Sequence, residues 1–167
     1  MYHIKKASIA DCTLINSLAS QVWEDTYGNI LSPEQLAYMF HMMYDVANIE
    51  KQMQEEGHTY FLIYNDTVPC AYLSIEQTAE TLFVFQKVYA LPSMQGKGVG
   101  RYMIEQGIAY LKGICSTPFS ITLNVNRNNS AKLFYEHLGF HVAAERDHPI
   151  GDGYFMNDYI MQIDITI

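Results

Sequence analysis

One segment constrains the fold more than any other: a long β-type run that leads through a glycine-spaced loop into an amphipathic helix. The run is Leu82–Leu91 (LFVFQKVYAL), and apolar residues recur at helical spacing from Val99 to Leu111. Nearly continuous apolar character predicts a central strand that is covered on both faces. Between the two lies Gln95–Arg101 (QGKGVGR), with glycine at every second position. A strand, a glycine loop and a helix are therefore expected in direct succession.

The loop has the features of a phosphate-binding site. The first backbone N–H groups of a helix have no partner within it, and the positive end of the helix dipole faces the loop. Gly96, Gly98 and Gly100 remove the Cβ atoms that would keep a diphosphate away from the backbone. Lys97 and Arg101 can add positive charge. A tight turn without a ligand is the alternative, whereas the spacings of a Walker A loop and of a Rossmann fingerprint are absent.

The rest of the chain alternates between helical and β-type patterns, without an internal repeat or a linker. Ser8 with Asp11 predicts a capping box, and Ser32 followed by Pro33 predicts a helix start. Pro69 predicts that its strand begins after it. The sequence predicts one domain over residues 1–167. Helices are expected over Ile15–Tyr27, from Pro33, over Asp45–Glu56 and over Ala131–Leu138, and strands over Tyr2–Lys6, Tyr60–Tyr64, Val68–Ile75, Phe119–Val125, Phe140–Ala144 and Tyr159–Ile167.

Composition narrows the functional class. The net charge of −8 argues against a general nucleic-acid binder, which needs clustered Lys and Arg, and it mildly favours a cationic substrate. No apolar run approaches the roughly 20 residues that span a bilayer, and the start lacks a leader pattern, so a cytoplasmic protein without a membrane partner is expected. Cys12, Cys70 and Cys115 show neither a disulfide framework nor a zinc spacing. The histidines lack metal-ligand spacing as well, so no metal is expected.

Two signatures in the chain resemble those of the GNAT N-acyltransferases. Gln95–Gly100 matches the pattern Q/R-x-x-G-x-G/A, and it follows Val88–Pro92 as the acetyl-CoA loop follows that family's fourth strand. Leu123–Phe140 (LNVNRNNSAKLFYEHLGF) resembles the family's fifth strand, its asparagine turn and the helix that ends in Y-E-x-x-G-F. The resemblance covers most of the chain. Trp23–Tyr27 and the tail segments His148–Gly153 and Asp158–Met161 also resemble the polyamine N-acetyltransferase branch.

The resemblance implies both a fold and a cofactor site. The fold is α/β in the sense of an α+β mixed sheet: about seven strands, mostly antiparallel, flanked by helices and splayed between the fourth and fifth strands. Acetyl-CoA (coenzyme A) would be the co-substrate. The pantetheine arm would bind the backbone of the fourth strand, the diphosphate would bind the loop, and an asparagine after the fifth strand would bind the arm. The implied contact residues are Val88, Tyr89, Ala90, Gln95, Gly96, Lys97, Gly98, Val99, Gly100, Arg101, Asn128 or Asn129, and Tyr135.

The resemblance also implies catalytic residues. Tyr135 stands where the family carries the tyrosine that protonates the departing thiolate, and its alternative role is that of a packed aromatic residue beside Phe134. Gln86 stands where relatives carry a glutamate base, and glutamine cannot take up a proton. Glu76, on the preceding strand, is the candidate substitute, and a water chain is the alternative. Asn124 also replaces a carboxylate of some relatives.

The leading hypothesis is an N-acetyltransferase that acts on a primary amine of a small molecule, with polyamines as one candidate class. Two alternatives stay open: a non-catalytic acyl-CoA-binding sensor or interaction module, for which Gln86 is the motive, and a peptide or protein N-acetyltransferase. A homodimer is expected only because it is the commonest symmetric assembly.

Overall fold

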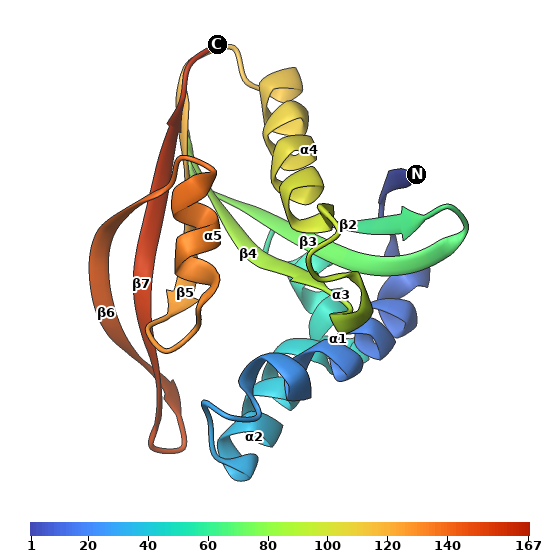
Figure 1. Ribbon diagram of the computed structural model, residues 1–167, viewed down its shortest axis with the longest axis vertical. Coiled ribbons are helices and arrows are strands. Elements are labelled where there is room, and N and C mark those ends of the chain that lie inside the picture. Colours follow the sequence, from blue (N-terminus) through green and yellow to red (C-terminus); the bar gives the residue numbers. More distant parts are fainter. The chain divides into compact units, whose positions relative to one another are not determined.

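The computed structural model describes residues 1–167, and it contains the helices and strands that the sequence predicts, with the β3 start and the β6–β7 hairpin as the main differences (Figure 1). In chain order the elements are β1 (Tyr2–Lys6), η1 (Ile9–Asp11), α1 (Cys12–Tyr27), α2 (Pro33–Tyr44), α3 (Val46–Gln54), β2 (His58–Asn65), β3 (Val68–Ala79), β4 (Leu82–Ala90), η2 (Pro92–Met94), α4 (Val99–Ile114), β5 (Phe119–Asn126), α5 (Ala131–His137), β6 (His141–Gly151) and β7 (Tyr154–Ile165).

The strands form one seven-stranded sheet in the order β1-β2-β3-β4-β5-β7-β6. The β4–β5 pair is parallel, whereas β1–β2, β2–β3, β5–β7 and β6–β7 are antiparallel. The predicted mixed, mostly antiparallel sheet with flanking helices is confirmed. The β4–β5 ladder consists of three residue pairs, Leu82–Val84 with Ser120–Thr122, so the later part of β4 lies outside it. None of the helices combines the length and the apolar character that crossing a membrane requires.

The chain divides into two compact units. The first contains Met1–Glu76 and Gln86–Ile114, and the second contains Gln77–Phe85 and Cys115–Ile167. The single domain expected over residues 1–167 stays a prediction.

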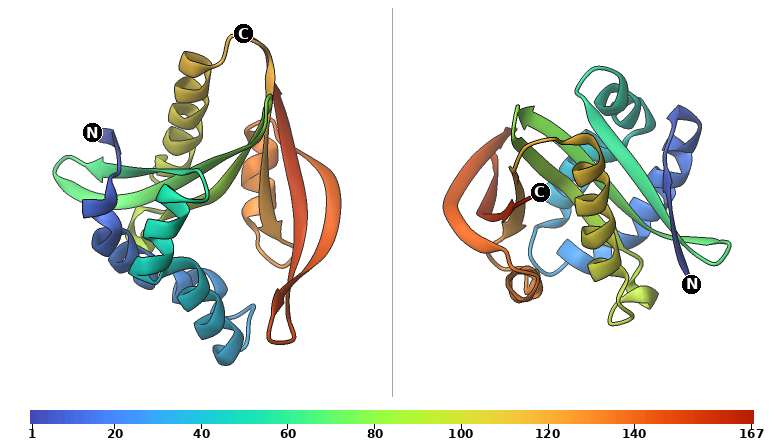
Figure 2. Two further views of the ribbon diagram at one scale, coloured as in Figure 1. Left: turned by 180° about the vertical axis from the view of Figure 1, so that it is seen from behind. Right: turned by 90° about the horizontal axis from the view of Figure 1, so that it is seen from above.

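In the first unit, α1, α2 and α3 cover one face of the strands and α4 covers the opposite face (Figures 1 and 2). Successive residues of a strand point to opposite faces of the sheet, so their side chains pack against different helical layers. Tyr72 of β3 packs edge-on against Tyr44 of α2 at 5.9 Å, whereas Phe61 of β2 packs edge-on against Tyr110 of α4 at 4.9 Å. Period-two alternation along the strands therefore divides the aromatic residues between two helical layers.

The local signals at the helix starts are confirmed. The Ser8 backbone N–H donates to the Asp11 carboxylate at 2.9 Å, which forms the capping box ahead of η1 and α1. Ser32 Oγ accepts from the Gln35 backbone N–H at 3.2 Å, with Pro33 at the first helical position of α2. These short-range bonds satisfy N–H groups that would otherwise lack partners.

The expected start of the third strand is wrong. β3 begins at Val68 and includes Pro69, which pairs with Tyr64. The register shifts at this point, because Tyr64 is opposite Pro69 whereas Ile63 is opposite Ala71, which leaves Cys70 without a counterpart on β2. A proline is tolerated at such a bulge, since the ladder is already interrupted where its N–H is missing.

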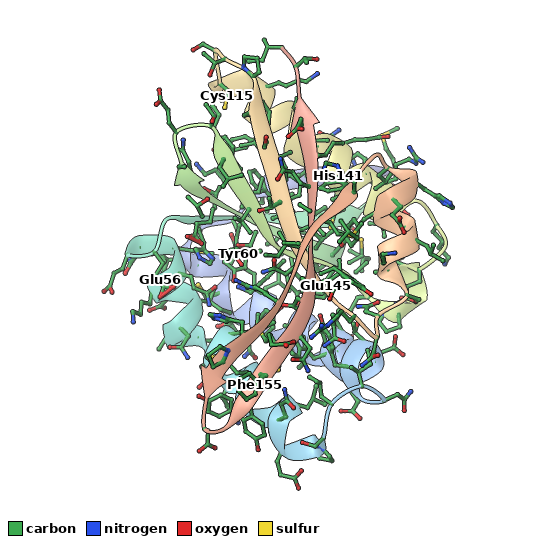
Figure 3. The ribbon with its side chains drawn as sticks, turned by 90° about the vertical axis from the view of Figure 1, so that its left-hand side faces the viewer. Glu56, Tyr60, Cys115, His141, Glu145 and Phe155 are labelled. Atoms are coloured by element: carbon green, nitrogen blue, oxygen red, sulfur yellow. The ribbon has the colours of Figure 1, made fainter.

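In the second unit, β6 and β7 form a long hairpin, which is longer than the sequence patterns predicted. The expected strands ended at Ala144 and resumed at Tyr159, but β6 continues to Gly151 and β7 starts at Tyr154. Asp152 and Gly153, with φ of 54° and 76°, make the two-residue turn, and Asp-Gly is a strong signal for such a turn. His141 and Glu145 lie along β6 and Phe155 lies near the tip of the hairpin (Figure 3). Helix α5 packs beside these strands, with Lys132 Nζ 5.4 Å from the ring centre of Tyr159.

Candidate functional site

The glycine loop joins η2 to α4 within the first unit, and its backbone requires glycine at two positions. Gly96 and Gly98 have φ of 75° and 82°, which side-chain-bearing residues rarely adopt. A Cβ atom built on either glycine would meet no atom within 4 Å. The glycines are therefore needed for their backbone conformation, and the space in front of them is open.

The loop presents a row of unpaired backbone N–H groups. Within it, Gln95 N–H donates to the Pro92 carbonyl at 3.2 Å and Lys97 N–H donates to the Met94 carbonyl at 3.3 Å. The first helical bond of α4 is made by Tyr102, which donates to the Gly98 carbonyl at 3.1 Å. The N–H groups without a protein acceptor are those of Gly96, Gly98, Val99, Gly100 and Arg101. Such a row at a helix N-terminus fits an anionic group such as a diphosphate.

Lys97 and Arg101, the two cationic residues that the sequence predicts for this site, both lie in the loop region. Arg101 forms an exposed ion pair with Glu105 one helical turn later, at 3.6 Å. The pair is worth little in water, so the guanidinium can exchange this partner for an anion at low cost. Lys97 is exposed.

The second predicted contact segment, Val88–Ala90, lies in the part of β4 that is outside the β4–β5 ladder. On the other side of this segment Leu91 N–H donates to the Cys70 carbonyl of β3 at 2.9 Å. The Tyr89 hydroxyl is 2.9 Å from that of Tyr27 in α1. β4 is thus the neighbour of β3 on one side, whereas its ladder with β5 ends at Val84.

Glu76 of β3 lies at the centre of a polar cluster in the first unit. Gln86 Nε2 of β4 donates to Glu76 Oε2 at 3.0 Å, and His58 Nε2 of β2 is also 3.0 Å from Oε2. Burial lowers the pKa of His58 and the nearby Lys87 lowers it further, against the opposing effect of Glu76. The imidazole is therefore neutral at pH 7 and its Nε2–H donates to the carboxylate, which leaves Nδ1 to accept from Ser74 Oγ at 3.4 Å.

Lys87 is the residue of this region that the sequence patterns missed. Its side chain is only 3% exposed, and its Nζ donates to Gln52 Oε1 of α3 at 2.9 Å. The ammonium lies 5.5 Å and 5.1 Å from the ring centres of Tyr44 and Tyr60, and Tyr60 is labelled in Figure 3. Burial lowers the pKa of Lys87 to about 7, although the charges of nearby glutamates oppose this. The available signal was a lysine inside a β-type run, among apolar residues that should be buried.

In the second unit, the asparagine turn distinguishes between its two candidates. Asn129 Oδ1 accepts from the Ala131 backbone N–H at 2.9 Å and thus caps the start of α5. Asn128 donates its backbone N–H to Asn126 Oδ1 at 2.9 Å, whereas its exposed side chain makes no hydrogen bond within the protein. Of the two side-chain amides, that of Asn128 is therefore the one without a partner inside the protein.

Tyr135 lies on α5 and is 8% exposed. Its ring packs edge-on against Phe134 at 5.1 Å and against Phe140 at 5.8 Å. This aromatic packing fixes the plane of the ring, which is compatible both with a packed residue and with a positioned hydroxyl.

A comparison with known protein families identifies the family to which this chain belongs. The family model described as "Acetyltransferase (GNAT) domain" matches residues 56–142, just over half of the chain. The chain belongs to the GNAT acetyltransferases. The matched residues run from the turn between α3 and β2 to the start of β6 and include the glycine loop, Glu76 and Tyr135.

Solved structures share the fold of this GNAT protein over nearly its whole length. The PaiA N-acetyltransferase of Thermoplasma acidophilum, solved with coenzyme A, has a TM-score of 0.78 at 22% identity, with 97% of this chain and 98% of that chain covered. The ribosomal-protein-S18-alanine N-acetyltransferase of Escherichia coli has a TM-score of 0.72 at 19% identity, with 100% and 96% covered. The spermidine/spermine N-acetyltransferase SpeG of Vibrio cholerae has a TM-score of 0.67 at 17% identity, with 98% and 93% covered.

As a GNAT acetyltransferase, the protein is an acetyl-CoA-dependent acyltransferase. The thioester of acetyl-CoA supplies the acetyl group, and the unpaired N–H groups between Gly96 and Arg101 suit the diphosphate of that molecule. No three His, Cys, Asp or Glu side chains gather closely enough to hold a metal ion.

Proposed function

We propose that this GNAT acetyltransferase transfers the acetyl group to a primary amine of a small molecule, with polyamines as the first class to test. The observation that carries the proposal is the Glu76 carboxylate, which two donors hold in place beside the strand expected to bind acetyl-CoA. The net charge of −8 and the likeness of the fold to a spermidine/spermine N-acetyltransferase support a cationic acceptor.

Glu76 is proposed as the proton acceptor. An alkyl ammonium titrates near pH 10.4 and must lose a proton before its nitrogen can attack a thioester. Gln86 cannot accept that proton, but its Nε2 and the imidazole of His58 both donate to Oε2 of Glu76. Two donors on one oxygen fix the carboxylate and leave Oε1 without a hydrogen bond inside the protein. Oε1 is therefore the atom proposed to face the ammonium group of the substrate.

Two further roles are proposed from the family resemblance. Tyr135 would protonate the thiolate of coenzyme A as it departs, which is general acid catalysis by a hydroxyl. Asn128, whose side chain has no partner within the protein, would bind the pantetheine arm. Backbone groups of Val88–Ala90 would bind the same arm as an added strand does.

The test is an acceptor screen with the purified protein. Polyamines, amino sugars, amino acids and peptide N-termini are each supplied with acetyl-CoA, and the release of free thiol is recorded. Polyamines or another small amine are expected to give the highest kcat/KM. A preference of at least tenfold for peptide N-termini would favour the peptide N-acetyltransferase, and tight acetyl-CoA binding by calorimetry without transfer to any amine would favour the sensor.

A further inference from the structure

Tyr2 on β1 contacts the glycine loop, although 95 residues separate it from its partner. The Tyr2 hydroxyl donates to the backbone carbonyl of Lys97 at 2.8 Å. Its ring packs on Tyr102 of α4, with 5.5 Å between the ring centres. Tyr2 is itself held in the sheet, where it pairs with Asn65 of β2. The loop carbonyl is thus tied to a strand of the same unit.

The hydrogen bond also sets the direction of an N–H group, because a carbonyl and the next N–H belong to one planar peptide unit. The Lys97–Gly98 peptide is trans, as are all peptide bonds of the chain. In a trans peptide the C=O and N–H bonds point in opposite directions. When Tyr2 holds the Lys97 carbonyl, the Gly98 N–H is consequently directed away from Tyr2. That N–H belongs to the unpaired row that continues into the first turn of α4.

The loop has few other restraints that would fix this peptide. The backbone bonds of the loop run from Gln95 at 3.2 Å, from Lys97 at 3.3 Å and from Tyr102 to the Gly98 carbonyl at 3.1 Å, and none of them holds the Lys97 carbonyl or the Gly98 N–H. Gly96 and Gly98 flank Lys97, and glycine has the greatest backbone freedom of any residue. Without the hydroxyl, rotation of the Lys97–Gly98 peptide would be opposed by little else.

We propose that Tyr2 is a positioning residue for the diphosphate of coenzyme A: it fixes the Lys97–Gly98 peptide so that the Gly98 N–H is already oriented for the anion. This inference rests on the proposed use of the glycine loop as the diphosphate site. Preorganisation of this kind lowers the entropy that binding would otherwise cost. Tyr2 touches neither the acetyl group nor the acceptor in this role, so it acts on donor affinity and not on the chemical step.

The test compares Tyr2→Phe with Tyr110→Phe. Both variants remove one hydroxyl and keep the ring, but the Tyr110 ring packs on Phe61 and its hydroxyl makes no hydrogen bond in the protein. The Kd for coenzyme A, measured by calorimetry, is expected to rise about fivefold in Tyr2→Phe, as the loss of one net hydrogen bond predicts. It is expected to stay unchanged in Tyr110→Phe. The Kd of S-acetyl-pantetheine, which lacks the diphosphate, is expected to be the same in all three proteins, and kcat at saturating acetyl-CoA is expected to be unchanged.

Three results would overturn the inference. The first is a Tyr2→Phe variant that binds coenzyme A as the wild type does. The second is an equal loss of affinity for S-acetyl-pantetheine, which would indicate general damage. A wild type without affinity for coenzyme A would overturn the diphosphate site together with the inference, whereas a wild type that binds it but acetylates no amine would overturn only the proposed acceptor.

A measurement on the ligand-free protein tests the restraint on the loop independently of coenzyme A binding. The ¹⁵N order parameters of Gly96 and Gly98 in the ligand-free protein are expected to fall in Tyr2→Phe and to stay unchanged in Tyr110→Phe. Unchanged order parameters in both variants would contradict the proposed restraint.

Discussion

The hydrogen bonds and the charge states of Glu76 and Lys87 depend on the residues that surround them in the folded protein. Glu76 receives two hydrogen bonds on one oxygen, whereas the only hydrogen bond of the Lys87 ammonium goes to the neutral amide of Gln52. A buried ammonium without a carboxylate partner is costly, and the protein meets this cost by lowering the pKa of the group. The carboxylate thus forms no ion pair with Lys87, and the lysine, with a pKa of about 7, is partly neutral at physiological pH.

Substituting the two proposed catalytic residues should separate chemistry from binding. Glu76→Gln is expected to lower kcat/KM for the amine about a hundredfold, since general base catalysis contributes at least that much. Tyr135→Phe is expected to lower kcat by a similar factor. The Kd for acetyl-CoA should stay within about twofold in both, because neither side chain is proposed to bind the diphosphate. Glu80→Gln, at the exposed turn before β4, is the matched control, and full activity of Glu76→Gln would remove it from the chemistry.

Lys87 should make the stability of the protein depend on pH. Its folded pKa of about 7 lies below the value of 10.5 that it has when unfolded, so between these values the unfolded chain binds more protons. The contribution of Lys87 to the free energy of unfolding therefore rises with pH across this window, by at most about 1.4 kcal/mol per pH unit, and it is lost as the pH falls toward 7. In urea unfolding at pH 7 to 9.5, the wild type is expected to gain stability relative to Lys87→Met. Parallel curves for the two proteins would contradict the lowered pKa.

At the scale of elements, the η2–loop–α4 segment shows how a backbone conformation creates a binding surface. The two positive-φ glycines turn the chain so that the first N–H groups of α4 stay unpaired. A capping side chain normally accepts a hydrogen bond from one of the first N–H groups of a helix, as Ser32 does at the start of α2. Here no protein acceptor pairs with the N–H groups, so an anion that bound them would stabilise the folded protein.

Two glycine substitutions in the same segment should have opposite effects. Gly98→Ala places a Cβ at φ of 82°, and it is expected to destabilise the fold by about 1 kcal/mol and to weaken coenzyme A binding. Gly113→Ala in the last turn of α4 meets no atom within 4 Å, and it is expected to stabilise by about 0.5 kcal/mol without affecting binding. Thermal unfolding and calorimetry check both. Equal effects at the two positions would show that the loop conformation does not require glycine.

At the scale of the whole molecule, the dominant feature is the charge. Eighteen acidic residues against ten Lys and Arg give a net charge of −8. Such a field raises the local concentration of cationic molecules and speeds their encounter with the protein. The field therefore speeds the encounter with a polycation more than the encounter with a monoamine. A homodimer stays a prediction, since charge does not determine assembly.

The charge predicts a salt dependence that grows with the charge of the acceptor. Raising NaCl from 20 mM to 300 mM is expected to lower kcat/KM severalfold for a polyamine and less than twofold for a monoamine, because screening shortens the reach of the field. Initial rates at saturating acetyl-CoA provide the measurement. Identical slopes for the two amines would show that the net charge does not steer the acceptor.

Features of this protein that depend on neighbouring residues can be predicted from the sequence. The strand–loop–helix succession around Gly96 and Gly98, the cap at Ser32 and the resemblance to the GNAT family were all visible, because glycine spacing, capping and apolar period act over a few residues. Asp152-Gly153 is a local signal as well, because this dipeptide favours the two-residue turn that joins β6 to β7.

Which distant residues meet depends on the tertiary structure. The register of β2, β3 and β4 brings His58 and Gln86 onto one oxygen of Glu76 and buries Lys87 against α3, and the bond from Tyr2 to Lys97 joins the first strand to the glycine loop. Such contacts depend on strand register and on burial, which are set by the packing of all elements together and not by any short stretch of sequence.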